Sequence, residues 1–98
     1  MRFKIFWLDS ALEILDSTAE YIKLKWGENA SQLFLNKTIR KINLLVNFST
    51  LGIKTNQRKN IRKLVISKNT SVYYQITKNK IIILTLFDTR QDINKLKL

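Results

Sequence analysis

The chain has 98 residues, of which 45% are hydrophobic and 26% charged, a composition typical of a globular protein and not of a disordered tail. We therefore expect residues 1–98 to form a single domain around one hydrophobic core. The absence of Cys and His excludes disulfides, zinc fingers, thiol nucleophiles and imidazole bases, so we expect no metal site and no cofactor.

The net charge of +11 favours an anionic partner. Residues 1–49 carry seven bases and five acids, whereas residues 50–98 carry eleven bases and two acids. Five bases and no acid form a basic cluster in one short stretch: Lys54, Arg58, Lys59, Arg62 and Lys63. We interpret this cluster as an anion-binding segment. The alternatives are a solvated loop that keeps the protein from aggregating, or lysine enrichment through codon bias, and composition does not separate them.

No apolar run, Ile81–Leu84 included, approaches the roughly 20 residues of a membrane span. The first residues also lack the apolar stretch and the cleavage site of a signal peptide. We expect a cytoplasmic protein without a membrane partner.

The first half of the chain predicts one strand and two helices. Alternating apolar residues predict a strand over Arg2–Trp7. Ser10 and Glu13 have the spacing of a capping box, and apolar residues at helical spacing follow them to about residue 26. Gly27 stands where a helix end favours a positive φ. We interpret the acidic side of this helix as a solvated face: Glu13, Asp16 and Glu20.

A second helical pattern covers about residues 29–47, so we expect a tight antiparallel helical hairpin. Residues 48–60 break both periodicities and predict the main loop. Three β-rich runs then predict an antiparallel meander: Ile61–Ser67, Ser71–Thr77 and Ile81–Phe87. The last run is apolar on both faces, which favours an interior position in the sheet. The expected fold is α+β, with the hairpin packed on a small, mostly antiparallel sheet.

Two pairs of aromatic residues carry further predictions. Trp7 and Trp26 lie at element ends, and we interpret them as caps of the core, not as platforms for stacking bases. Tyr73 and Tyr74 are adjacent on a strand and point to opposite faces, so we expect at most one of them to be buried.

Motifs along nearly the whole chain resemble the RelE/ParE superfamily of type II toxins, most closely its ParE-like branch, often labelled plasmid stabilisation proteins. The order and spacing of the pieces carry the resemblance: Ala11 to Ala19-x-Tyr21-Ile22, Ala30 with Phe34, Leu51-Gly52, Ile61-Arg62-x-Leu64, Val72-Tyr73-Tyr74-x-Ile76 and Phe87-Asp88-x-Arg90-Gln91-Asp92. The Pro that the family usually carries before Gly52 and after Asp92 is absent.

The resemblance implies one scaffold with two activities. RelE-like members enter the ribosomal A site and cleave mRNA, whereas ParE-like members poison DNA gyrase. Arg62 matches a basic position that the nucleases use, and Arg90 matches the Arg near the end of their chain. Lys54, Arg58 and Lys59 lie in the loop where the nucleases carry further bases.

The nucleases also use a C-terminal Tyr or His, which has no counterpart after Arg90. Cleavage by a 2′-hydroxyl needs a proton acceptor, and Arg stays protonated at neutral pH. Asp92 and Tyr73 are the substitutes that we consider, and a purely structural pairing of Arg62 or Arg90 with Asp88 or Asp92 is the alternative for the two arginines.

Our leading interpretation is a toxin that inhibits DNA gyrase without catalysis and is neutralised by a cognate antitoxin. The alternative is an mRNA endonuclease acting on the ribosome, with Arg62 and Arg90 as catalytic residues. A member whose only partner is the antitoxin is the third possibility. The candidate contacts with the target are the basic cluster and the end of the chain: Lys54, Arg58, Lys59, Arg62, Lys63, Arg90, Lys95 and Lys97.

Overall fold

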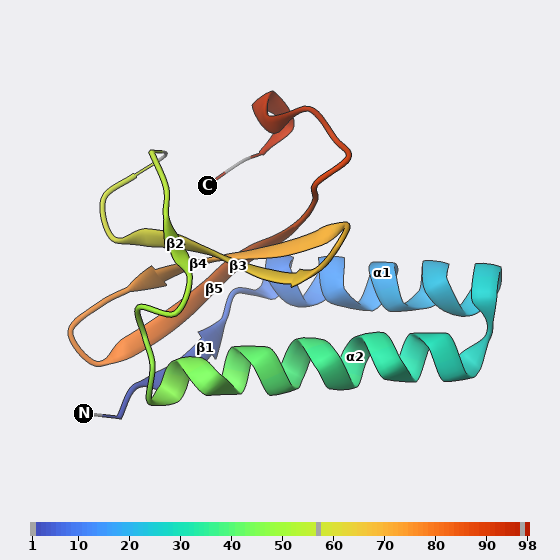
Figure 1. The fold of residues 1–98 in the computed structure, drawn as a ribbon, viewed down its shortest axis with the longest axis horizontal. Coiled ribbons are helices and arrows are strands. Elements are labelled where there is room, and N and C mark those ends of the chain that lie inside the picture. Colours follow the sequence, from blue (N-terminus) through green and yellow to red (C-terminus); the bar gives the residue numbers. More distant parts are fainter. Residues whose placement is uncertain (1, 57, 97) are drawn as a thin grey trace.

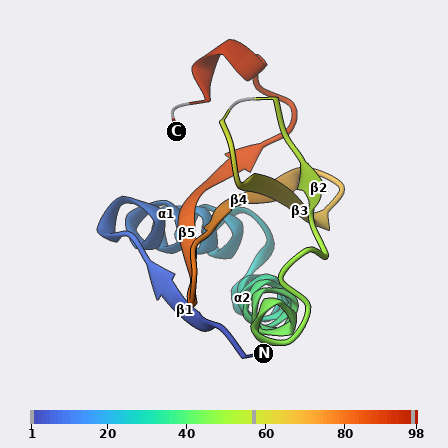
Figure 2. The same ribbon diagram turned by 90° about the vertical axis from the view of Figure 1, so that its left-hand side faces the viewer.

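Five strands form one sheet, and two helices cover one of its faces (Figures 1 and 2). The computed structural model describes residues 2–56, 58–96 and Leu98. The strand order is β1-β5-β4-β3-β2, in which β1 runs parallel to β5 and the remaining neighbours are antiparallel. The elements are β1 (Lys4–Trp7), α1 (Asp9–Trp26), α2 (Glu28–Asn43), η1 (Leu44–Val46), β2 (Ile53–Lys54), β3 (Ile61–Ser67), β4 (Thr70–Ile76), β5 (Lys80–Asp88) and η2 (Ile93–Lys95).

The predicted helical hairpin is confirmed. Gly27 separates α1 from α2 with φ 100°, and its amide donates to the carbonyl of Lys23 at 2.9 Å. The buried hydroxyl of Ser31 donates to the carbonyl of Ala19 at 2.8 Å and so joins the two helices. The acidic side of α1 is exposed, as predicted, at Glu13, Asp16 and Glu20.

The ends of the helices differ from the prediction. Helix α1 begins at Asp9, and Leu8 precedes it without any side-chain cap, so the capping box predicted at Ser10 and Glu13 is wrong. The amide of Leu8 instead donates to the carbonyl of Ile83 at 3.2 Å. This hydrogen bond to β5 fixes the residue at which the helix begins. Helix α2 ends at Asn43 and continues as the 3₁₀ turn η1, short of the predicted end.

The main core lies between the hairpin and the sheet, where α1 packs on β5 and α2 on β3. Trp7 is half-buried and packs against this core, as predicted. Trp26 is 60% exposed, so its predicted place as a core cap is wrong. It ends α1 at the tip of the hairpin, which extends beyond the sheet in Figure 1.

The sheet is covered on its second face as well. Tyr73 and Tyr74 are 4% and 0% exposed, which contradicts the prediction that at most one is buried. Tyr74 belongs to the main core, whereas Tyr73 packs with Ile61 and Phe87 in a smaller cluster that Leu96 and Leu98 cover. In Figure 1 the C-terminal segment accordingly lies on the side of the sheet away from the helices.

The predicted meander is confirmed as β3, β4 and β5, with bounds shifted by one residue at some ends. Strand β5 lies between β1 and β4, the interior position expected from its two apolar faces. The predicted loop 48–60 contains β2, which was not predicted because two residues are too few to show a periodicity. Among the described residues, no helix is long and apolar enough to cross a membrane.

Candidate target-binding surface

The structure gathers most of the predicted cations around β2 and the loop that follows it. Lys54 lies on β2 opposite Arg62 of β3, and Lys63 is the next residue of β3. Arg58 and Lys59 are exposed in the loop between the two strands. Within the described residues no ion pair joins these five side chains to an acid. The five residues of the basic cluster therefore lie along one edge of the sheet, on β2, on β3 and in the loop between them.

Arg62 differs from the other cations of the cluster, because its guanidinium is hydrogen-bonded to backbone carbonyls. Its Nη1 donates to the carbonyl of Gly52 at 2.7 Å and to the carbonyl of Thr50 at 3.3 Å. The predicted alternative for Arg62, a pairing with Asp88 or Asp92, is therefore wrong. Its side chain is half-buried and holds the turn that leads into β2.

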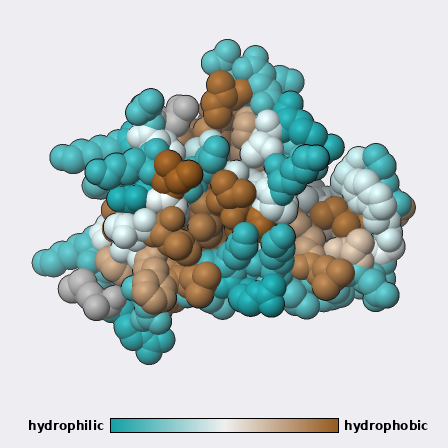
Figure 3. All heavy atoms as spheres, viewed as in Figure 1, coloured by the Kyte–Doolittle hydropathy of each residue, from teal (hydrophilic) through white to brown (hydrophobic). Residues whose placement is uncertain are grey.

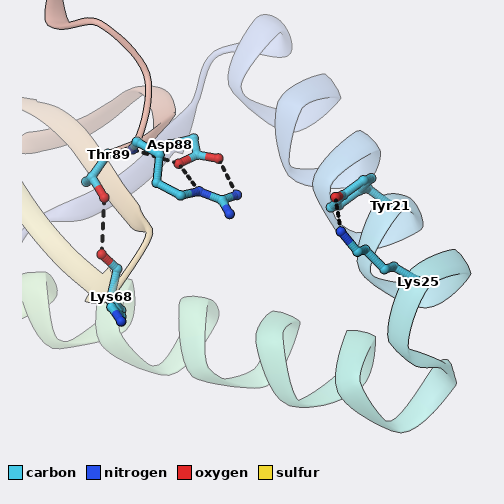
Figure 4. A network of polar contacts seen from close by, with 6 residues as sticks. Tyr21, Lys25, Lys68, Asp88 and Thr89 are labelled. Carbon is cyan, nitrogen blue, oxygen red and sulfur yellow. Dashed lines mark hydrogen bonds and ion pairs between the residues drawn. The ribbon is translucent and has the colours of Figure 1, made fainter.

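Arg90 does pair with an acid, in agreement with one of the predicted alternatives. Its Nη2 and Nε donate to the two carboxylate oxygens of Asp88 at 2.7 and 3.1 Å, and its amide donates to Asp88 at 2.9 Å. These hydrogen bonds hold the pKa of Asp88 below its usual range. Figure 4 shows Asp88 on the side of the sheet that faces α1, while Thr89 turns to the carbonyl of Lys68.

The structure does not bring Arg62 and Arg90 into one site. Arg62 is paired with Tyr74 near one end of β4, whereas Asp88 is paired with Thr70 at the other end. Thr70 and Tyr74 are four residue steps apart along β4, roughly 13 Å of backbone. Each guanidinium is bonded on its own side, so the two cations do not converge on a common point.

The two candidate proton acceptors are also engaged. Tyr73 is buried beside Phe87, with ring centroids 6.4 Å apart, and burial raises the pKa of its hydroxyl. Asp92 accepts a hydrogen bond from the amide of Asn94 at 3.0 Å and caps η2. Lys95, also in η2, is exposed, and Lys97 lies outside the described residues.

An apolar groove adjoins the basic cluster. It has a volume of about 330 Å³ and lies between α2, β2 and β3. Lys41 bridges α2 to β3 by donating to the carbonyls of Val65 and Ile66 at 3.2 and 2.9 Å. Figure 3 shows apolar side chains gathered on this side of the molecule, with hydrophilic ones along the margins. The groove is lined by Lys41, Leu44, Leu51, Gly52, Ile53, Lys63, Leu64 and Val65.

Comparison with known proteins supports one family. The model of the ParE toxin of the type II toxin-antitoxin system parDE matches residues 5–93, nearly the whole chain. The chain belongs to the ParE toxin family. The RelE/ParE resemblance and the fold that it implies are thereby confirmed. No curated protein matches the sequence.

Solved structures share the fold of this ParE-family toxin at low sequence identity. The chromosomal ParDE toxin-antitoxin system of P. aeruginosa matches with a TM-score of 0.77 and 15% identity, covering 89% of this chain and 96% of that one. The DinJ-YafQ toxin-antitoxin complex of E. coli matches with a TM-score of 0.62 and 12% identity, over 92% and 96%. The YoeB dimer of Staphylococcus aureus matches with a TM-score of 0.61 and 15% identity, over 89% and 97%.

The ParE-family toxin has a second groove, where two of the predicted contact residues lie beside aromatic side chains that the sequence did not indicate. A groove of about 630 Å³ lies between α1, the end of β5 and the C-terminal segment, and Arg90 and Lys95 are among its lining residues. Tyr21 and Trp26 line it too and are half-exposed or more, with Lys25 stacked over both rings. Figure 4 shows the Lys25 ammonium at the Tyr21 hydroxyl, 3.1 Å away. The sequence did not indicate these exposed aromatic residues because Trp26 fits the apolar stripe of α1. That stripe continues beyond the end of the sheet, so Trp26 is exposed.

Replacing Arg90 by Gln in this toxin should raise the pKa of Asp88 toward its ordinary value. The folded state of the wild type lowers that pKa, so the pair stabilises the fold above the ordinary pKa of Asp and loses its effect as the pH falls through the lowered value. The Arg90 side chain is 63% exposed and the Asp88 side chain 34%, so solvent screens the pair and we expect little change in thermal stability at neutral pH. NMR titration of the Asp88 carboxyl checks this, with Lys95→Gln as control. An unshifted pKa would contradict the pairing.

Proposed function

We propose that the protein is a type II toxin that inhibits DNA gyrase without catalysis and is neutralised by a cognate antitoxin. One observation carries the non-catalytic part of the proposal: the two arginines that a nuclease would need are bonded separately, Arg62 to backbone carbonyls and Arg90 to Asp88. Family membership supports the toxin role and the antitoxin partner. Gyrase as the target rests on the ParE-like character of the motifs.

The surroundings of Tyr73 and Asp92 support the same proposal. A general base must reach the proton that it abstracts and must be able to accept it. Tyr73 is 4% exposed and its pKa is raised, while Asp92 already accepts a hydrogen bond from the amide of Asn94. Neither group supplies an available base near Arg62.

The alternative function is ribosome-dependent cleavage of mRNA. The exposed cations Lys54, Arg58 and Lys59 favour it, because such clusters bind the phosphate backbone of nucleic acids. In that case Arg62→Ala should abolish mRNA cleavage in a translation extract while the protein stays folded. Cleavage that persists in the variant would exclude Arg62 as a catalytic residue.

Pulse labelling of DNA and protein synthesis separates the two functions. The gene is induced for minutes in a bacterial host that lacks the antitoxin, and both syntheses are measured in the same culture. We expect DNA synthesis to fall while translation is at first intact. An immediate fall in translation would overturn the proposal in favour of mRNA cleavage, and no change in either would leave a protein whose only partner is the antitoxin. DNA gyrase and the ribosome are both cytoplasmic, so either function implies that the protein acts in the cytoplasm.

Association with the antitoxin should depend strongly on ionic strength. We propose that an acidic, partly disordered segment of the antitoxin folds over the basic surface and fills an apolar groove beside the hairpin. With a net charge of +11, the toxin should attract such a segment over long distances at low salt. We expect the association rate to fall roughly tenfold between low and high salt, measured by stopped-flow mixing. Equal rates would contradict this electrostatic attraction.

A further inference from the structure

A single buried tyrosine holds the turn that leads into the basic cluster. Tyr74 is 0% exposed, yet its hydroxyl lies at the backbone of residues 49–52. It donates to the carbonyl of Ser49 at 2.7 Å and accepts from the amide of Gly52 at 2.9 Å. Burial raises the pKa of Tyr74, although the Gly52 amide and Arg62 partly offset this, so the hydroxyl keeps the proton that it donates.

Arg62 completes this set of bonds from the neighbouring strand. It faces Tyr74 across the β3–β4 pair and donates to the carbonyls of Gly52 and Thr50. Two side chains of the sheet thus bond to three residues of one turn. We call Tyr74 and Arg62, with their four bonds to the turn, the clamp.

The turn lies so close to the sheet that only glycine fits at its centre. A Cβ at Gly52 would lie 2.7 Å from the Tyr74 hydroxyl and 2.8 Å from the carbonyl of Lys63. Both approaches are shorter than a carbon-to-oxygen contact allows. The Leu51-Gly52 pair of the sequence is therefore explained by the closeness of the turn to β3 and β4.

The clamp sets the position of side chains that a partner would meet. Leu51 and Ile53, on either side of Gly52, are 49% and 66% exposed and form one wall of the apolar groove. Lys54 follows directly and opens the basic cluster. A strand of only two residues has few bonds of its own, so the geometry of this wall depends on the clamp.

We infer that Tyr74 and Arg62 are positioning residues of the target-binding surface: they fix the 49–54 turn and act through Leu51, Ile53 and Lys54 without touching the target. This inference rests on the proposed function only in assuming that this surface meets the target. It also reassigns Arg62, which the sequence predicts as a catalytic or anion-binding residue. The partner that fits the surface is a protein segment with apolar side chains for the groove and acidic ones for the cluster.

The first test asks whether the clamp exists in solution. Tyr74→Phe removes the hydroxyl and keeps the ring, so the Gly52 amide loses its acceptor. We expect its hydrogen exchange to become about tenfold faster or more. Tyr73→Phe is the matched control, because this adjacent buried tyrosine forms no hydrogen bond with the described residues, and it should leave Gly52 within about twofold of the wild type. Unchanged exchange in Tyr74→Phe would overturn the clamp.

The second test asks whether the clamp acts on the target. The level of folded protein that arrests growth is measured for the wild type and the variants by quantitative blotting. Tyr74→Phe and Arg62→Gln should each raise this level about tenfold, whereas Tyr73→Phe and Arg40→Gln, which lowers the charge equally on exposed α2 surface, should leave it within about twofold. If Tyr74→Phe fails to fold, Arg62→Gln still tests the role of the clamp in target binding, because Arg62 lies outside the main core.

Arg62→Lys separates positioning from direct contact. Lysine keeps the charge but lacks the planar fork, so a positioning role predicts a loss close to that of Arg62→Gln. Full activity of Arg62→Lys would instead indicate direct charge contact and overturn the inference. Faster exchange at Gly52 with unchanged growth arrest would also overturn it. A wild type that does not arrest growth contradicts the proposed function and the role in target binding together, while the exchange of Gly52 still decides whether the clamp exists.

Discussion

Replacing four cations of the basic cluster by glutamine should abolish growth arrest while the protein stays folded. The four positions are Lys54, Arg58, Lys59 and Lys63; Arg62 is left in place because it holds the turn. The described part of the chain shows no acid paired with any of them, so their positive charge is available to an acidic partner. At about 0.5 to 1 kcal/mol for each charge contact, the loss of four corresponds to binding weaker by roughly a hundredfold.

The control for this variant keeps the same net charge. Replacing Lys37, Arg40, Lys68 and Lys78 by glutamine also lowers the charge from +11 to +7, with three lysines and one arginine in each set. All four control residues are exposed and lie outside the basic cluster. We expect this control to arrest growth at nearly the wild-type level of protein. Equal loss in both variants would show that total charge matters and that the position of the cluster does not.

Replacing Ile83 by Ala should destabilise the fold by about 2 to 5 kcal/mol, the range for deleting a buried aliphatic side chain that leaves a cavity. Ile83 is 0% exposed on β5, and it lies in the main core with Ala11 and Leu15 of α1. Its strand is hydrogen-bonded on both sides, to β1 and to β4, so the backbone has little freedom to collapse into the cavity. A chain of this length has a total stability of roughly 5 to 15 kcal/mol, so the variant would lose a large part of it.

Urea denaturation followed by circular dichroism measures this loss. The matched control is Ile93→Ala, the same deletion at a position that is 50% exposed in η2. We expect the control to change the free energy of unfolding by no more than about 0.5 kcal/mol. A loss below about 1 kcal/mol for Ile83→Ala would contradict the tight packing of α1 on β5.

Local patterns predicted the elements well because periodicity reflects which side of an element faces the core. The two helices, the positive φ of Gly27 and the three meander strands all follow from residue spacing. The basic cluster is also found where the sequence places it, on the loop before β3 and at the start of that strand. Composition and spacing determined these features since each depends on neighbouring residues alone.

Predictions about individual residues failed where segments distant in the sequence determine the local structure or the burial of a side chain. Ser10 and Glu13 have the spacing of a capping box, but the bond from Leu8 to Ile83 starts the helix earlier. Trp26 continues the apolar stripe of α1, but within the described residues no strand lies beneath the tip of the hairpin. Sequence spacing reports which residues share a face of an element and does not report how far the opposing element extends.

The sequence by itself determined the α+β class, the order of the two helices and of every strand except β2, the basic cluster and, through its motifs, the toxin family. Only the tertiary structure decided that Tyr73 is buried, because Leu96 and Leu98 return from the chain end to cover it. Only the tertiary structure decided that Arg62 binds the turn at Gly52 and that Arg90 binds Asp88. A charged or aromatic side chain takes its role from the groups that surround it, and here those groups come from parts of the chain that the fold brings together.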